Sequence, residues 1–214
     1  MSFKRAFIYT GGKVYDELVS EQPTADDIVI AADAGALLAK RLGVTPNIMV
    51  GDFDTLTNPD VPSGTELIRL PAEKDETDTQ FAVSLALERG ADEIIMIGGL
   101  EGRLDHTLAF LSILEDLWEN RQRRVPAVIT SGKNRVRYLR NSGVILPRSQ
   151  YRYFGVLAAD SQIKGVTVEG AKYPLKNKTL LRSNRGLAIS NEIVGNCALI
   201  EIKKGSAWIV ECMD

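Results

Sequence analysis

Residues 28–54 read IVIAADAGALLAKRLGVTPNIMVGDFD, a segment in which two apolar runs enclose a pattern with helical spacing. The apolar run 28–32 predicts a buried strand. Residues 34–42 then follow with helical spacing and end at Gly43, and glycine is the favoured residue just past a helix end. Residues 48–50 predict a second apolar strand. A strand, a helix and a strand in this order are typical of a parallel β-α-β unit.

The same alternation extends in both directions along the chain. Further strands and helices are predicted at residues 6–9, 66–70, 78–89, 93–97, 105–120 and 127–130. Repeated β-α units of this length predict an α/β fold with a mainly parallel sheet flanked by helices.

The pattern changes after about residue 132. Short alternating segments separated by turn residues follow, at 136–139, 144–146, 151–157, 166–169, 179–181, 199–202 and 208–210. Such spacing is typical of an antiparallel β-sandwich. We therefore expect two domains, an α/β domain at residues 1–134 and a C-terminal β-sandwich at residues 135–214.

Composition excludes several classes of function. A net charge of -2 gives no basic surface for nucleic acid or an anionic membrane, so neither is an expected partner. Cys197 and Cys212 are the two cysteines and form no CxxC motif, which argues against a zinc site or a disulfide framework. No stretch approaches the roughly 20 apolar residues that cross a bilayer. We expect a cytoplasmic protein.

Acidic residues follow the predicted strands directly. Asp33 ends IVIAAD, and Asp52 and Asp54 follow the next strand in VGDFD. If the chain stays extended there, Asp52 and Asp54 point to one side while Phe53 points into the packing. The carboxyl ends of parallel strands share one edge, which is where open α/β sheets bind ligands.

A second acidic group precedes the helix predicted at residues 78–89. It reads EKDETDTQ and includes Asp75, Thr77 and Asp78. Thr77 and Gln80 have the spacing of a capping box, so Asp78 also has a purely structural interpretation at a helix start. Taken with Asp52 and Asp54, however, the carboxylates favour a Mg²⁺ site, because crowded acids need a compensating cation.

Two glycine turns follow predicted strands. One contains Gly11 and the other, GGLEGR, contains Gly99 and Gly102. Both could offer backbone N–H groups to phosphate, although the chain has no GxxxxGK[ST] loop. Arg103, Asp105 and His106, the single histidine, follow the second turn. Arg103 could bind a phosphate oxygen, with Asp105 orienting either Arg103 or His106.

At this point the chain resembles the thiamin pyrophosphokinase family. The resemblance rests on segments in the family's order, over nearly the whole chain: residues 32–56, 73–83, 98–114, 168–177 and 187–193. It implies an α/β nucleotide-binding domain followed by a β-sandwich, and a homodimer with active sites between subunits. The implied reaction transfers the pyrophosphoryl group of ATP to the hydroxyl of thiamin, giving thiamin diphosphate and AMP.

The resemblance also implies roles for individual residues. The expected Mg²⁺ ligands are Asp52, Asp54 and Asp78, with Asp75 and Thr77 beside them in the catalytic site. The expected nucleotide site contains Gly11, Lys74, Gly99, Gly102, Arg103, Asp105 and His106. The expected thiamin site contains Asp33, Tyr173, Ser190 and Asn191; the Tyr173 ring could stack on a heterocycle.

Two alternatives stay open from the residues themselves. The acceptor could be another alcohol, such as a pterin or a thiamin analogue, because the acids would serve equally well. The chain could instead bind thiamin or nucleotide as a sensor without turnover. The sequence also leaves open which acid orients the hydroxyl proton.

Overall fold

The computed structural model describes residues 4–53, 60–71, 73, 75–120 and 123–214. The predicted site residues Asp54 and Lys74 lie outside this set. The chain divides into two compact units. Unit 1 comprises Met1–Ile113 and Gln122–Gly132, and unit 2 comprises Leu114–Arg121 and Lys133–Asp214.

Unit 1 contains a parallel sheet with strand order β4-β3-β2-β1-β5-β6. The strands are β1 (Arg5–Tyr9), β2 (Ile28–Ala32), β3 (Ile48–Gly51), β4 (Glu66–Arg69), β5 (Glu93–Ile97) and β6 (Ala127–Thr130). The β2 strand is buried at every position, which explains its continuous apolar sequence. The parallel direction brings the carboxyl ends of all these strands to one edge.

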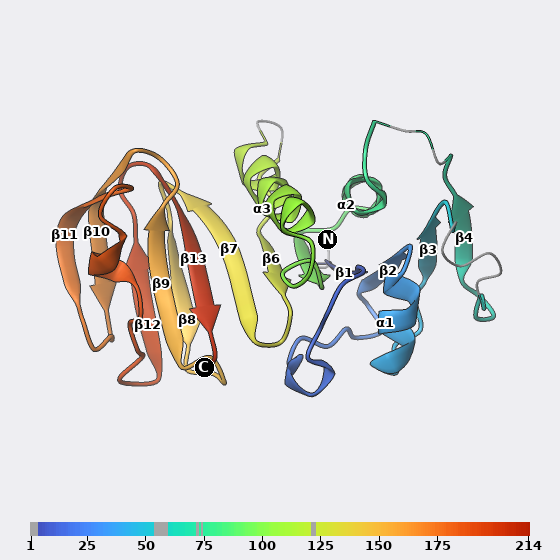
Figure 1. Cartoon of the computed structure of the whole chain (residues 1–214), viewed down its shortest axis with the longest axis horizontal. Helices are drawn as coiled ribbons and strands as arrows, with labels where there is room; N and C mark the ends of the chain where they lie inside the picture. Colours follow the sequence, from blue (N-terminus) through green and yellow to red (C-terminus); the bar gives the residue numbers. More distant parts are fainter. Residues whose placement is uncertain (1–3, 54–59, 72, 74, 121–122) are drawn as a thin grey trace. The chain divides into compact units, whose positions relative to one another are not determined.

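Helices cover both faces of this sheet. Figure 1 shows α1 (Gly35–Arg41) on one face and α2 (Asp78–Glu88) on the other. A short 3₁₀ turn, η1 (Asp16–Leu18), and the first part of α3 (Leu104–Glu119) also belong to unit 1. The sheet face that packs on α1 is apolar and includes Phe7, Val29, Ile95 and Ile97, which form one buried cluster with Leu38 of α1.

Gly35 fixes how closely α1 approaches the sheet. A Cβ atom added at Gly35 would lie 2.0 Å from the carbonyl oxygen of Tyr9, far inside van der Waals contact. The start of α1 can therefore rest against the end of β1 only because residue 35 has no side chain. This contact sets the position of the turn that carries Asp33.

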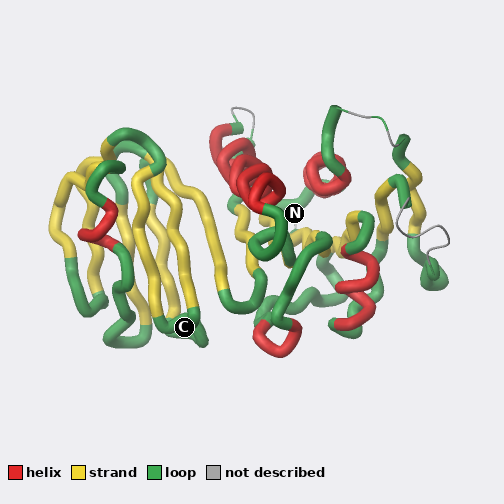
Figure 2. The backbone as a smooth tube through the Cα atoms, in the orientation of Figure 1, coloured by secondary structure: helices red, strands yellow, loops and turns green. Residues whose placement is uncertain are grey.

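Unit 2 is built almost wholly of antiparallel strands, drawn in yellow in Figure 2. Within this unit, β7, β13 and β9 pair in that order, and β11, β10, β12 and β8 form a four-stranded sheet. The strands are β7 (Asn134–Arg140), β8 (Gly143–Pro147), β9 (Tyr153–Ala158), β10 (Gln162–Glu169), β11 (Leu175–Leu181), β12 (Cys197–Glu201) and β13 (Ser206–Cys212). A short 3₁₀ turn, η2 (Arg185–Ala188), follows β11.

Alternation along the strands of unit 2 separates its two faces. In β12, for example, Ala198 and Ile200 are buried while Cys197, Leu199 and Glu201 are exposed. The predicted fold class, a mainly parallel α/β sheet followed by an antiparallel β-sandwich, is confirmed. In the part of the chain that is described, no helix is long and apolar enough to span a membrane.

Candidate active site

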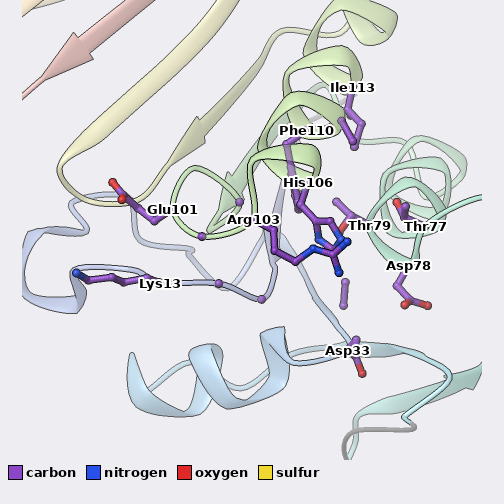
Figure 3. A pocket seen from close by; sticks show the side chains of 16 residues that line it. Lys13, Asp33, Thr77, Asp78, Thr79, Glu101, Arg103, His106, Phe110 and Ile113 are labelled. Carbon is purple, nitrogen blue, oxygen red and sulfur yellow. The ribbon is translucent and has the colours of Figure 1, made fainter.

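A pocket of about 400 Å³ opens in unit 1, beside the carboxyl ends of β1, β2 and β5. Its lining comprises Gly11, Gly12, Lys13, Ala32, Asp33, Thr77, Asp78, Thr79, Gly99, Glu101, Gly102, Arg103, His106, Ala109, Phe110 and Ile113 (Figure 3). Of the residues predicted for the site, it brings together Gly11, Asp33, Thr77, Asp78, Gly99, Gly102, Arg103 and His106.

The two glycine turns lie against each other at this pocket. A Cβ at Gly12 would be 3.1 Å from the carbonyl oxygen of Glu101 and 3.7 Å from the backbone nitrogen of Gly99. Gly98 has φ +114°, and a Cβ there would lie 2.4 Å from Oγ1 of Thr10. The turn after β5 therefore needs glycine for both its conformation and its closeness to the turn after β1.

Asp33 and Asp78 contribute carboxylates to the pocket from different elements. Asp33 follows β2 with φ 45°, a left-handed conformation that aspartate tolerates, and its backbone N–H donates to the carbonyl of Val50 at 2.7 Å. Asp78 is the first residue of α2. One carboxylate oxygen of each, Oδ1 of Asp33 and Oδ1 of Asp78, is shielded from solvent.

These carboxylates are a suitable donor set for Mg²⁺. That ion is held in proteins by one or two carboxylates, and waters and substrate phosphates complete its coordination. Within the described residues, no group of three or more His, Cys, Asp or Glu side chains is arranged to hold a metal ion. Asp54 lies outside those residues, so the full predicted set of ligands stays a prediction.

The chain is not extended at Phe53, contrary to the expectation for Asp52 and Asp54. Phe53 has φ 55°, in the left-handed region, so simple alternation does not govern its neighbours. Its ring is buried against Ala31 and Met49, which confirms that it points into the packing. Asp52, beside Phe53, is half-buried and does not line the pocket.

Thr77 caps α2 as its sequence predicts. Its Oγ1 accepts the backbone N–H of Gln80 at 3.2 Å, and Oε1 of Gln80 accepts the backbone N–H of Thr77 at 2.9 Å. This capping box fixes the helix start, and with it Asp78. Asp75 is exposed and does not line the pocket.

Arg103 and Asp105 form an exposed ion pair at the start of α3. Nη2 of Arg103 lies 2.6 Å from Oδ2 of Asp105, and its Nε lies 3.2 Å from Oδ1. Hydrogen bonding to Arg103 lowers the pKa of Asp105 below its ordinary value. Asp105 is therefore in direct contact with Arg103, and Figure 3 shows Arg103 lying next to His106.

The sequence did not single out the apolar wall of the pocket. Ala109, Phe110 and Ile113 line it from α3. Phe110 and Ile113 are 9% and 5% exposed, so their spacing of three residues looks like an ordinary core-facing helix stripe. Lys13 and Thr79 were also missed; Figure 3 shows Lys13 and Glu101 pointing away from the other labelled side chains.

The remaining predicted residues lie in unit 2. Ser190 lines a pocket of about 480 Å³ with Tyr153, Phe154, Gly155, Leu157, Ile189, Val210, Cys212 and Asp214. Tyr173 is 55% exposed, and Asn191 is 3% exposed. The Asn191 side chain is hydrogen-bonded to the backbone of Tyr173, so these two predicted residues are neighbours.

Both units match family models. One, described as "Thiamin pyrophosphokinase, catalytic domain", matches residues 21–128. The other, described as "Thiamin pyrophosphokinase, vitamin B1 binding domain", matches residues 143–207.

Relatives are found among curated proteins. The thiamine pyrophosphokinase of Bacillus subtilis (strain 168) is 26% identical over 190 residues, which cover 86% of this chain and 87% of that protein. Thiamin pyrophosphokinase 1 of Caenorhabditis elegans is 24% identical over 176 residues, which cover 78% of this chain and 70% of that protein.

Solved structures share the fold. A thiamine pyrophosphokinase from Bacillus subtilis superimposes with a TM-score of 0.82 at 22% identity, over 99% of both chains. One from Geobacillus thermodenitrificans gives a TM-score of 0.81 at 24% identity, over 99% of this chain and 98% of that one. The predicted activity, transfer of the pyrophosphoryl group of ATP to thiamin to give thiamin diphosphate and AMP, is confirmed. The chain belongs to the thiamin pyrophosphokinase family.

Proposed function

We propose that the pocket of unit 1 holds the phosphates of ATP during pyrophosphoryl transfer to thiamin. The observation that carries this proposal is the composition of the pocket: two aspartates, an arginine, a histidine and two glycine turns line it at the carboxyl edge of the parallel sheet. Open α/β sheets bind ligands at this edge. The reaction consumes ATP, whose phosphates form a polyanion that the arginine and the backbone N–H groups of the glycine turns can bind.

The backbone N–H groups of Gly11, Gly99 and Gly102 then bind phosphate oxygens, because glycine turns let a ligand approach the backbone closely. Arg103, oriented by Asp105, meets a phosphate oxygen with its planar guanidinium. We assign His106 and Lys74 as further nucleotide-binding residues. The apolar wall formed by Ala109, Phe110 and Ile113 suits a nucleobase.

Asp52, Asp54 and Asp78 hold a Mg²⁺ ion in this proposal, with Asp75 and Thr77 beside them. When bound, the ion neutralises charge on the phosphate oxygens. Asp78 is positioned by the capping box at the start of α2, so its carboxylate needs little reorganisation on binding.

The acceptor site consists of Asp33 together with Tyr173, Ser190 and Asn191. We assign residues 1–134 as the catalytic domain and residues 135–214 as the thiamin-binding domain. Active sites are completed in a homodimer, between subunits, as the sequence resemblance implies. The enzyme works in the cytoplasm, where ATP is available.

The thiamin hydroxyl attacks the β-phosphorus in line, the new bond forms from its oxygen, and AMP leaves with the electrons of the broken P–O bond. An aspartate accepts the hydroxyl proton. Transfer through a loose transition state depends on positioning and charge neutralisation more than on covalent catalysis, which this set of fixed polar groups can supply.

The test is an assay of purified protein with ATP, Mg²⁺ and thiamin that separates AMP from ADP. AMP in equal amount with thiamin diphosphate is the expected result. ADP with thiamin monophosphate would contradict transfer of a pyrophosphoryl group. Nucleotide binding without any product would favour the sensor interpretation.

A further inference from the structure

Asn191 joins three segments of unit 2. Its backbone pairs with Phe154 of β9 in both directions, with N–H to O distances of 2.8 and 3.0 Å. Its side-chain Oδ1 accepts the backbone N–H of Tyr173 at 2.9 Å, and its Nδ2 donates to the carbonyl of Tyr173 at 2.9 Å. The side-chain amide thus makes the pair of hydrogen bonds to Tyr173 that the backbone of a residue in a neighbouring strand would make.

Little of the Asn191 side chain remains for a ligand. Its Oδ1 also accepts the backbone N–H of Glu192 at 3.0 Å. An amide oxygen has two acceptor sites and an amide nitrogen two hydrogens, so three of the four positions are in use. The residue is also 3% exposed. These features describe a residue that holds the protein chain in place.

The segment that Asn191 holds carries the exposed ring of Tyr173. Two neighbouring contacts join the same segments: the backbone N–H of Lys172 donates to the carbonyl of Glu192 at 2.9 Å, and Nζ of Lys172 lies 2.7 Å from Oε1 of Glu192. The side-chain amide of Asn191 contacts the backbone of Tyr173 directly. The Asn191 amide therefore fixes the position of the backbone from which the Tyr173 ring extends.

We propose that Asn191 is a positioning residue for the acceptor site, which acts through the backbone of Tyr173 and does not touch thiamin. This inference rests on the proposed function, in which Tyr173 stacks on a heterocycle of thiamin. The chemistry demands an amide at position 191. An aspartate would keep the bond from the Tyr173 N–H but would set a carboxylate oxygen against the Tyr173 carbonyl oxygen.

The test is a double-mutant cycle on the whole chain. Steady-state KM for thiamin and for ATP, and kcat, are measured for wild type, Asn191→Asp, Asn191→Ala, Tyr173→Ala and both double variants. Each single change at Asn191 should raise the KM for thiamin about tenfold, the effect of losing one strong hydrogen bond. The KM for ATP should stay within about twofold. In the Tyr173→Ala background, either change should add nothing.

Asn141 provides the control. Its Oδ1 accepts the backbone N–H of Gly205 at 2.8 Å, so Asn141→Ala removes a side-chain bond to the backbone elsewhere in unit 2 and also places alanine at φ 47°. It should lower the melting temperature without changing either KM. If Asn191→Ala does not fold, Asn191→Asp carries the test because it retains two of the three bonds.

Two results would overturn the proposal. If the increases in the KM for thiamin caused by the Asn191 and Tyr173 changes multiply in the double variants, Asn191 contacts thiamin directly. If a variant at Asn191 lowers the melting temperature without changing either KM, as Asn141→Ala should, the role of Asn191 is purely structural. Either result requires an active wild type. Failure of the proposed function would instead appear as a wild type that forms no thiamin diphosphate.

Discussion

Arg103 and Asp105 lie two residues apart and form a two-point ion pair at the start of α3, with Nη2 of Arg103 2.6 Å from Oδ2 of Asp105. Their side chains are 72% and 63% exposed, so the pair contributes little to stability. It does fix the direction of a guanidinium that lines the pocket of unit 1. We interpret the pair as a way to preorganise Arg103 for phosphate.

Replacing Asp105 by Asn should therefore weaken ATP binding. The neutral amide holds Arg103 less firmly, and the KM for ATP should rise about threefold, as befits an exposed pair. Asp16→Asn is the control, because Asp16 makes a comparable two-point pair with Arg41 away from the pocket. Equal KM values for ATP in both variants would show that orientation of Arg103 is unimportant.

Gly98→Ala tests the closeness of the two glycine turns. An added methyl group would lie 2.4 Å from Oγ1 of Thr10 and 2.9 Å from the carbonyl oxygen of Gly11, and the backbone has φ +114°. We expect a loss of about 3 kcal/mol in the free energy of unfolding, from backbone strain and overpacking together. The displaced turn should also raise the KM for ATP.

Gly64→Ala is the control for that variant. Gly64 has φ +86° but no atom within 4 Å of an added Cβ, so it tests the backbone strain alone. A loss of about 1 kcal/mol is expected there, without a change in KM. Chemical denaturation measures the unfolding free energy of both variants. Equal losses for Gly98→Ala and Gly64→Ala would show that the close approach of the two glycine turns contributes nothing to stability.

Asp27 should make stability depend on pH. Burial raises the pKa of its carboxyl group, but hydrogen bonds from Arg5 and Thr24 outweigh burial, so the pKa is lowered from 3.8. A carboxyl group with a lowered pKa stabilises the fold above its unfolded pKa, and this contribution is lost as the pH falls through the folded pKa.

At pH 7, Asp27→Asn should therefore cost about 2 kcal/mol of unfolding free energy. The difference from wild type should hold from pH 7 to pH 5 and shrink below about pH 4. Asp26→Asn, at the exposed neighbour, should change stability little at any pH. A difference for Asp27→Asn that is constant down to pH 3 would contradict this account.

The sequence predicted the fold because periodicity and turn residues agree in this chain. The buried run at β2 and the glycine after α1 both appear at the expected positions. The prediction for β10 (Gln162–Glu169) covered only residues 166–169. Register shifts interrupt the pairing of β10 with β11, and such irregular pairing weakens the alternating sequence pattern by which a strand is predicted.

The site was predictable where polar residues directly follow the carboxyl ends of strands or begin helices. Asp33, Asp78, Arg103 and His106 follow strand ends or begin helices, and they line one pocket. The left-handed conformation of Phe53 was not predictable, because the alternating pattern of an extended chain carries no signal for a positive φ at a non-glycine residue. The apolar wall was missed since residues facing a pocket and residues facing the core share the same spacing.

Sequence patterns also could not reveal how Asn191 is used. The family resemblance of LAISNEI implies a polar group near thiamin. Whether Asn191 contacts the ligand or supports another residue depends on the groups to which its side chain is hydrogen-bonded. The partner, Tyr173, lies 18 residues earlier in the chain. Only the fold brings the two together.

In the proposed mechanism, acids at the carboxyl edge of the parallel sheet carry the transfer. The most direct measurement is the rate of AMP formation by Asp78→Asn, compared with Glu88→Gln at the exposed end of the same helix. We predict that Asp78→Asn lowers kcat about a thousandfold or more and changes the unfolding free energy by only about 0.5 kcal/mol, because a single first-turn acid adds little to helix stability. Glu88→Gln should keep wild-type turnover. Wild-type turnover in folded Asp78→Asn would contradict the account.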